Sequence, residues 1–352
     1  MNQLSTPIHR VAVIGAGAWG TTLARHLANK GLTVHLWAYE SEVVETIRTH
    51  GENTLFLPGV RLPDRLRSST DIQEVVQDAE LLVLGVPSHA MRVVCSRLGS
   101  MLSEPRPVVI ASKGIEEGSH HFMSQLLCEV LPPSWHSWLT VLAGPSFASE
   151  VCQEKPTTVV LAGKDSQLVT SLQTVFMTPQ FRVYTSTDVL GAQIGGALKN
   201  VMAIAAGVVD GLDLGYNARA ALITRGLTEM VRIATALGAD MRTLYGLSGL
   251  GDLVLTCTGP LSRNYSVGQK LGAGQSLPEI LQTTKTVAEG IRTTRAVVGL
   301  ANQLSIDMPI AQSVYGILFE ERDPQEAVSS LMVRAAKRES DSTTLSTFPS
   351  SS

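Results

Sequence analysis

A glycine triplet near the N-terminus has the residue types and spacing to hold a phosphorylated cofactor. Gly15, Gly17 and Gly20 follow the apolar run Arg10–Ile14 and precede a segment of helical character that ends at Gly31. In a strand–turn–helix unit the first glycine permits a tight turn, the second lets a pyrophosphate approach the backbone, and the third lets the helix pack on the strand. Unpaired N–H groups and the helix dipole favour an anion at that point. The spacing predicts a dinucleotide site, and a tight turn without a ligand is the alternative.

An acidic residue stands where such a site needs one. We expect a second strand at Thr33–Trp37, and Glu40 follows it, 20 residues beyond Gly20. A carboxylate there accepts hydrogen bonds from a ribose 2′-hydroxyl and repels a 2′-phosphate. The neighbouring Tyr39 supplies no positive charge. We therefore expect NADH to be used at least as well as NADPH.

Three polar groups in the second half interrupt apolar or helix-forming sequence. Lys199 lies in a glycine-rich apolar segment, where a lysine needs a partner or a lowered pKa. Asp252 is the one charge in another apolar stretch and is a candidate partner for that lysine. The run Ser262–Asn264 opens a predicted helix that ends near Gly272, and its cap, guanidinium and amide could together hold an anion. Each has a structural alternative. Lys199 could extend to solvent, Asp252 could cap a helix, and Ser262 could cap its helix beside a solvated Arg263.

The elements that must position these residues follow from the hydrophobic period. Strands are expected at Leu81–Val86, Val108–Ala111, Thr140–Ala143, Thr158–Ala162 and Phe181–Tyr184. Three of them end in V-P-S-H, S-K-G and G-P-S loops, and open α/β sheets bind ligands at the carboxyl ends of their strands. From Asp188 the period becomes helical, with helices expected to start at Asn217 and to cover Val287–Leu304 and Pro309–Phe319.

This pattern predicts a doubly wound parallel (Rossmann) α/β sheet followed by an all-helical C-terminal domain. We place the dinucleotide-binding domain at 1–187, the helical substrate domain at 188–339, and a disordered Ser/Thr-rich tail at 340–352. If both halves face one cleft, its lysines, arginine and aspartate suit a phosphorylated carbonyl substrate. The sequence has no Ser/His/Asp set and no metal-ligand cluster, which argues against hydrolysis.

Composition narrows the class of protein. The chain has 352 residues, 44% hydrophobic and 17% charged, with a net charge of −3, as in a globular protein without a basic stripe for nucleic acid. Four cysteines without CxxC spacing indicate reduced thiols and a cytoplasmic protein. We see no signal peptide, and the apolar runs are shorter than the roughly 20 residues of a membrane span.

In combination, several motifs resemble one family over about 11–337. They are GAGAWGT, NTLFLP, VPSH, SKGIE, GPSFASE, GGALKN, NARAALITRGLTEM, GLGDLVLT, SRN and VAEG. The chain resembles the bacterial-type NAD(P)-dependent glycerol-3-phosphate dehydrogenases. The resemblance implies hydride transfer between NAD(P)H and dihydroxyacetone phosphate, giving sn-glycerol 3-phosphate for phospholipid synthesis, or the reverse. A homodimer is compatible with the resemblance, which by itself does not decide the cofactor preference or the direction of the reaction.

The same resemblance implies roles for individual residues. Lys199 is the implied proton donor or acceptor, with Lys113 and Asp252 as catalytic partners. The implied substrate site comprises Lys113, Gly144, Ser146, Lys199, Asn200, Asp252, Ser262, Arg263 and Asn264. The implied cofactor site comprises Gly15, Gly17, Ala18, Trp19, Gly20, Tyr39, Glu40, Lys113, Ala148, Arg263, Val287 and Glu289.

Two other functions stay open on the residues alone. A dehydrogenase of the same architecture could act on a hydroxy acid, which has no phosphate and would not need the Ser262–Asn264 run. A dinucleotide sensor without catalysis would leave Lys199 and Asp252 as incidental charges.

Overall fold

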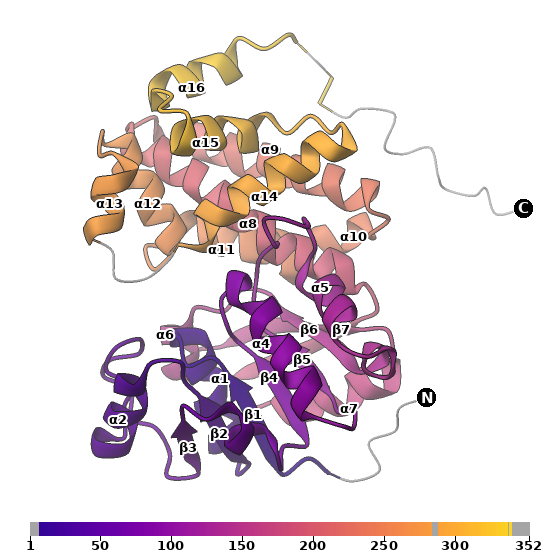
Figure 1. The fold of residues 1–352 in the computed structure, drawn as a ribbon. Helices are drawn as coiled ribbons and strands as arrows, with labels where there is room; N and C mark the ends of the chain where they lie inside the picture. The colour runs from indigo at the N-terminus through magenta and orange to yellow at the C-terminus, as the bar shows by residue number, and fades with distance from the viewer. Residues whose placement is uncertain (1–6, 284–287, 337, 340–352) are drawn as a thin grey trace, which may run out of the picture.

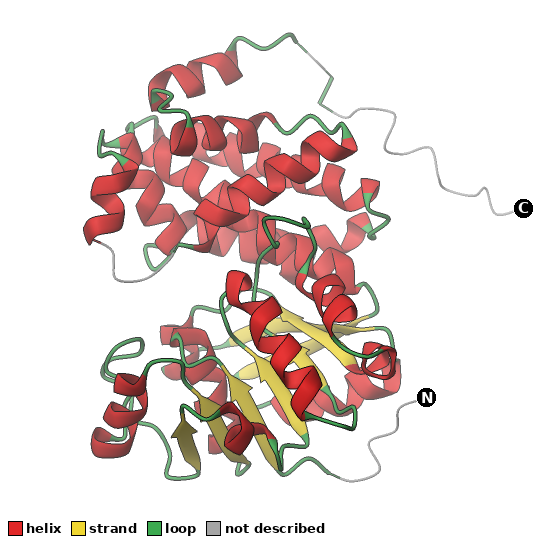
Figure 2. Ribbon diagram, viewed as in Figure 1, coloured by secondary structure: helices red, strands yellow, loops and turns green. Residues whose placement is uncertain are grey.

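A single twisted sheet organises the first half of the chain (Figures 1 and 2). The computed structural model describes residues 7–283, 288–336 and 338–339, so the predicted tail at 340–352 lies outside the described residues. The sheet order is β3-β2-β1-β4-β5-β6-β7-β8. The strands are β1 Arg10–Ile14, β2 Thr33–Trp37, β3 Leu66–Ser69, β4 Leu81–Leu84, β5 Val108–Ile110, β6 Leu139–Ala143, β7 Thr157–Gly163 and β8 Phe181–Ser186.

Strand order reverses beside β1, as in a doubly wound fold, which confirms the predicted fold class. The strands run parallel except at β6 and β7, which pair antiparallel. A parallel connection needs a dozen or more residues with a helix that carries the chain back along the sheet. Only the five-residue α6 (Ala148–Cys152) lies between these strands, so β7 returns in the opposite direction. β8 then pairs parallel with β7.

Helices cover both faces of this sheet. One face packs α1 (Ala18–Asn29), α2 (Ser41–His50) and α7 (Ser166–Phe176) against the strands. The opposite face packs α3 (Ile72–Val76), α4 (Ser88–Met101) and α5 (Met123–Val130). A short 3₁₀ turn at Pro133–Trp138 leads from α5 into β6.

The second half is helical and is built around α8 (Val189–Gly211) (Figure 1). α8 is long and apolar enough to cross a membrane, with a mean hydropathy of 1.3, but it is buried as the central helix of this half. The helices around it are α9 Gly215–Ala236, α10 Met241–Leu244, α11 Asp252–Thr258, α12 Arg263–Gly272, α13 Leu277–Thr283, α14 Glu289–Leu304, α15 Pro309–Phe319 and α16 Pro324–Met332, with a π-helical turn at Leu247–Gly251.

The predicted start of one helix is wrong. α9 begins at Gly215 after Leu214, and Asn217 lies inside its first turn instead of capping it. The chain turns from α8 into α9 through Asp213 and Gly215, both at positive φ, so the helix starts where this turn ends.

Glycines set the distance between α8 and α12. A Cβ on Gly207 would lie 2.1 Å from the carbonyl oxygen of Tyr265, and one on Gly268 would lie 2.0 Å from that of Ile204. The two helix backbones therefore touch, and this contact fixes the start of α12 beside the middle of α8.

The loop after β5 joins the two halves. Ile115 and Phe122 form an isolated antiparallel bridge, and both are buried in the core of the helical half. At the tip of the same loop, Glu117 lies 3.5 Å from Arg292 of α14.

Candidate active site

The glycine turn has the shape expected of a phosphate-binding turn. Gly15 has φ +115°, and a Cβ there would lie 2.7 Å from the backbone of Gly85. A Cβ on Gly20 would lie 1.9 Å from the carbonyl oxygen of Gly15, so only glycine lets α1 lie this close to β1. At Gly17 a Cβ would meet no protein atom within 4 Å, which leaves the start of α1 open to a ligand.

Side chains around this turn also fit a dinucleotide. Trp19 Nε1 is buried and has no hydrogen-bond partner among the described residues. Tyr39, with 82% of its surface exposed, and Glu40, also exposed, follow β2. Ala148 begins α6, which packs on α1, and its carbonyl oxygen lies 3.5 Å from Thr22 Oγ1. An open helix start, an unpaired donor and a carboxylate after β2 together accommodate a pyrophosphate and a ribose.

Two lysines share one buried carboxylate where the two halves meet. Lys199 Nζ lies 2.5 Å from Asp252 Oδ1, and Lys113 Nζ lies 2.7 Å from Oδ2. Lys113 Nζ also donates to the carbonyl oxygen of Gly144 at 3.2 Å. α8, α11 and the loops after β5 and β6 thus converge on a single point.

Burial sets the protonation of this cluster. It lowers the pKa of Lys199 to about 8, because the surrounding apolar helices solvate an ammonium poorly. The Asp252 carboxylate acts in the opposite direction, whereas the Lys113 ammonium lowers the pKa further. Lys199 can therefore both give and take a proton near neutral pH.

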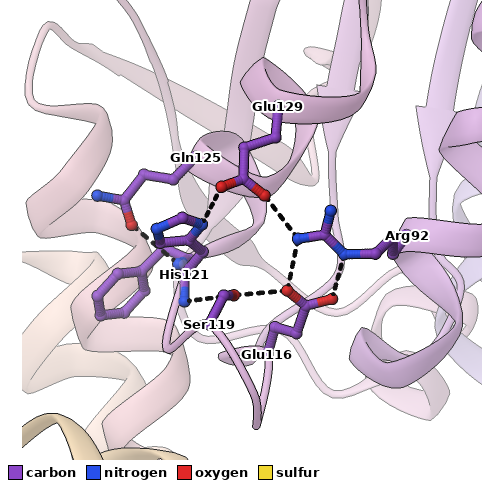
Figure 3. A network of polar contacts seen from close by, with 7 residues as sticks. Arg92, Glu116, Ser119, His121, Gln125 and Glu129 are labelled. Carbon is purple, nitrogen blue, oxygen red and sulfur yellow. Dashed lines mark hydrogen bonds and ion pairs between the residues drawn. The ribbon is translucent and has the colours of Figure 1, made fainter.

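A polar network holds the loop that carries Lys113 (Figure 3). Arg92 of α4 donates to both carboxylate oxygens of Glu116, at 2.8 and 2.7 Å, and to Glu129 of α5 at 2.6 Å. Ser119 donates to Glu116, and His121 Nδ1 lies 3.0 Å from Glu129. Two helices of the sheet domain therefore anchor the segment that begins three residues after Lys113.

The loop after β6 adds a carbonyl oxygen and a hydroxyl beside the lysines. Ser146 Oγ donates to the carbonyl oxygen of Gly144 at 3.0 Å, the same oxygen that Lys113 reaches. Gly144 is constrained, since a Cβ there would lie 3.0 Å from the Cα of Val159.

The start of α12 forms the opposite side of the site. Ser262 Oγ accepts from the N–H of Tyr265 and so caps α12, as predicted. Asn264 Nδ2 donates to Asn200 Oδ1 at 2.9 Å, while its Oδ1 accepts from the N–H of Gly290 at 2.9 Å. These bonds orient the Asn200 side chain so that its amide nitrogen remains available as a donor.

Arg263 brings a positive charge to the start of α12. Within the described parts of the chain, its guanidinium makes no hydrogen bond or ion pair, although it is exposed. Surrounding protein lowers the pKa of Arg263, and the charge of Glu289 partly offsets this effect. Five donors on an unpaired guanidinium suit a phosphate or carboxylate.

Comparison with known proteins decides the family. Residues 10–169 match the N-terminal domain, and residues 188–329 the C-terminal domain, of NAD-dependent glycerol-3-phosphate dehydrogenase. The chain belongs to this family.

Individual members of the family are similar over nearly their whole length. A glycerol-3-phosphate dehydrogenase [NAD(P)+] of Geobacter metallireducens is 52% identical over 94% of this chain and 98% of its own. A glycerol-3-phosphate dehydrogenase [NAD(P)+] of Myxococcus xanthus is 48% identical over 94% of this chain and 98% of its own. The crystal structure of glycerol-3-phosphate dehydrogenase from Coxiella burnetii superposes with a TM-score of 0.88 at 40% identity, covering 93% of this chain and 99% of that one.

One contact near the site was not predicted from the sequence. Ser88, the first residue of α4, donates its hydroxyl to Glu289 Oε2 at 2.6 Å, and its N–H lies 3.3 Å from Oε1. The sequence places the V-P-S-H loop at the ligand-binding edge of the sheet but assigns no role to any of its residues. Its partner is 201 residues away in sequence, so no local signal could reveal the pair. Val287, which the resemblance places at the cofactor, lies outside the described residues.

Proposed function

We propose that this protein interconverts dihydroxyacetone phosphate and sn-glycerol 3-phosphate with NAD(P)H as cofactor. Two observations support the proposal: the family membership of the chain, and the Lys199–Asp252–Lys113 cluster where its two halves meet. When bound, the nicotinamide supplies or accepts the hydride, and the protein provides orientation and charge.

Lys199 carries the proton in this proposal. Reduction of a carbonyl places negative charge on its oxygen, which a nearby ammonium can neutralise by proton transfer. With a pKa of about 8, Lys199 is mostly protonated at neutral pH and returns to that state readily. In the oxidation direction, its neutral amine takes the hydroxyl proton.

Lys113 and Asp252 provide the charges that surround the proton transfer. The Lys113 ammonium adds positive potential at the developing oxyanion. Asp252 fixes both lysines through its two carboxylate oxygens, and burial keeps water from competing. Gly144 and Ser146 then supply the polar wall beside the substrate carbons.

The start of α12 holds the substrate phosphate. Arg263 donates to it, with Ser262, Asn264 and Asn200 as the neighbouring polar groups. Binding energy at this remote group positions the carbonyl carbon for the transfer.

The glycine turn and its neighbours hold the cofactor. Gly15, Gly17 and Gly20 with Ala18 and Trp19 bind the pyrophosphate half, and Tyr39 and Glu40 lie at the adenosine ribose. Lys113, Ala148, Arg263, Val287 and Glu289 complete the cofactor site by resemblance.

The wider setting follows from the reaction. Glycerol 3-phosphate supplied in this way feeds phospholipid synthesis in the cytoplasm, where the four free cysteines remain reduced. We also propose a homodimer, which sedimentation equilibrium of the purified protein would test.

Turnover tests the proposal directly. The purified protein should oxidise NADH or NADPH when dihydroxyacetone phosphate is added, and should not do so with pyruvate or another unphosphorylated keto acid. Turnover of the keto acid alone would favour a hydroxy-acid dehydrogenase, and binding of NADH without any turnover would favour a sensor.

A further inference from the structure

The contact between Ser88 and Glu289 joins the two halves of the chain beside the site. The hydroxyl and the N–H of Ser88 both point to the carboxylate of Glu289, the first residue of α14. Ser88 is buried, with 3% of its surface exposed. Because Ser88 begins the 14-residue helix α4, the helix dipole also favours the carboxylate at this position.

The loop that carries Lys113 presses against the same pair. A Cβ on Gly114 would lie 2.7 Å from the Cβ of Ser88 and 3.6 Å from Glu289 Oε2. The backbone of Gly114 therefore packs directly against the Ser88 side chain, and a larger residue at position 114 would displace it. The position of the Glu289 carboxylate is set by the sheet domain, although Glu289 belongs to the helical half.

The topology places this carboxylate at one particular part of the cofactor. A dinucleotide crosses the sheet at the point where strand order reverses, here beside β1. The ribose-binding residues follow β2 on one side, so the nicotinamide half extends over the other side, beyond the end of β4. Ser88 follows β4 by four residues, and Glu289 is held there with it.

The carboxylate keeps acceptor capacity for a ligand. Ser88 provides the hydrogen bonds that the described residues make to the side-chain carboxylate of Glu289, and a carboxylate has about four lone-pair sites. The unused sites can accept from the carboxamide N–H groups or the ribose hydroxyls of a nicotinamide nucleotide. The guanidinium of Arg263 lies close enough to Glu289 for the two charges to interact.

We propose that Ser88 is a positioning residue for the nicotinamide half of the cofactor, acting through Glu289. The proposal rests on the proposed function for the identity of the cofactor. It assigns the V-P-S-H loop a task that the glycine turn cannot perform, because that turn fixes only the pyrophosphate.

A double-mutant cycle on NADH binding tests the proposal without using turnover. The variants are Ser88→Ala, Glu289→Ala and the double variant, each titrated with NADH by fluorescence. We expect Ser88→Ala to weaken NADH binding about tenfold, the scale of one hydrogen bond to a charged group. We expect the double variant to bind no more weakly than Glu289→Ala alone, because the hydroxyl acts through that carboxylate.

Two results would overturn the proposal. One is NADH binding by Ser88→Ala within twofold of the unmodified protein, and the other is single effects that multiply in the double variant. Ser100→Ala, at the exposed far end of α4, is the matched control and should leave NADH binding and turnover unchanged. If Ser88→Ala does not fold by circular dichroism, Ser88→Cys replaces it under the same criteria.

A kinetic comparison separates this proposal from the proposed function. At saturating NADH, Ser88→Ala should keep the KM for dihydroxyacetone phosphate within about threefold, because the phosphate site is untouched. Failure of the unmodified protein to reduce dihydroxyacetone phosphate would contradict the proposed function, while the NADH titrations would still decide the role of Ser88.

Discussion

Lys199 and Asp252, on two different helices, meet through a contact of 2.5 Å between Nζ and Oδ1 inside an apolar core. Both charges are buried and little solvated, so Lys199 depends on the carboxylate of Asp252, and Asp252 depends on Lys199 together with Lys113. Burial lowers the pKa of Lys199 below that of a lysine in water, and the Asp252 carboxylate limits this decrease.

Lys199→Ala should remove most of the turnover and leave cofactor binding intact. Loss of a positioned acid or base costs roughly 10²–10⁴ in rate. kcat for dihydroxyacetone phosphate reduction is the measurement, with circular dichroism to show folding and Lys164→Ala, an exposed lysine, as control. A variant with kcat within a factor of three of the unmodified protein would exclude Lys199 as the proton donor.

The pH profile should report the same group. Reduction requires the ammonium of Lys199, whose pKa is about 8, so kcat/KM for dihydroxyacetone phosphate should fall as the pH rises above about 8. Asp252 raises this pKa, so Asp252→Asn should move the fall to lower pH. An unchanged profile in Asp252→Asn would show that another group controls it.

Arg263→Ala should damage substrate use more than NADH binding. A hydrogen bond to a charged group contributes about 1.5–3 kcal/mol, or roughly 10- to 150-fold in kcat/KM. The comparison is kcat/KM for dihydroxyacetone phosphate against NADH affinity by fluorescence, with the exposed Arg242→Ala as control. Equal losses in both, or a loss in NADH affinity alone, would remove Arg263 from the phosphate site.

The end of β2 should favour NADH. Glu40 repels a 2′-phosphate, and the exposed Tyr39 brings no positive charge to offset it. We expect kcat/KM with NADH at least equal to that with NADPH, and a shift towards NADPH in Tyr39→Arg. The exposed Tyr245→Arg controls for added charge. A tenfold preference of the unmodified protein for NADPH would contradict the role given to Glu40.

Glu229→Ala should destabilise the helical half. The buried Glu229 carboxylate accepts from the N–H groups of Ile310 and Ala311 at 2.7 and 3.2 Å, at the start of α15. Leaving these donors without a partner and opening a cavity should cost roughly 2–4 kcal/mol, measured by urea unfolding. The exposed Thr224→Ala on the same helix should change stability little.

The stability lost in Glu229→Ala should become smaller as the pH rises. Burial raises the pKa of Glu229 to about 7, above its ordinary 4.5. Between these values the folded protein binds a proton that the unfolded chain does not, so stability from this group declines as the pH rises. The difference between the unmodified protein and Glu229→Ala should therefore narrow from pH 5 to pH 8, and a widening difference would contradict it.

Local sequence patterns predicted most of the sheet. The strand–glycine–helix unit and β4, β5 and β6 have apolar runs bounded by turn residues, which require no knowledge of distant segments. β3 was missed because Leu66–Ser69 is mostly polar and lies at the edge of the sheet, where one face reaches solvent. The antiparallel direction of β7 depends on the length of α6, which an apolar run alone does not indicate.

The site was predictable where residue type alone carries the signal. A lysine among apolar residues and an isolated aspartate suggested their own pairing. The bonds of Asn264 to Asn200 and Gly290 depend on how closely α12 approaches α8. That distance is set by glycines whose partners lie about 60 residues away, so it belongs to tertiary packing.

The burial of Ile115 and Phe122 in the helical core bears on how this architecture can be recombined. A cut near residue 187 would separate the sheet from the helices in sequence. It would also remove Ile115 and Phe122 from the helical core and leave two cavities there. In a chimera that takes its helical half from a relative, the side chains around these cavities would have to fit the loop that carries Ile115 and Phe122. For protein engineering, the exchangeable unit is therefore the helical half together with the loop from Lys113 to Phe122.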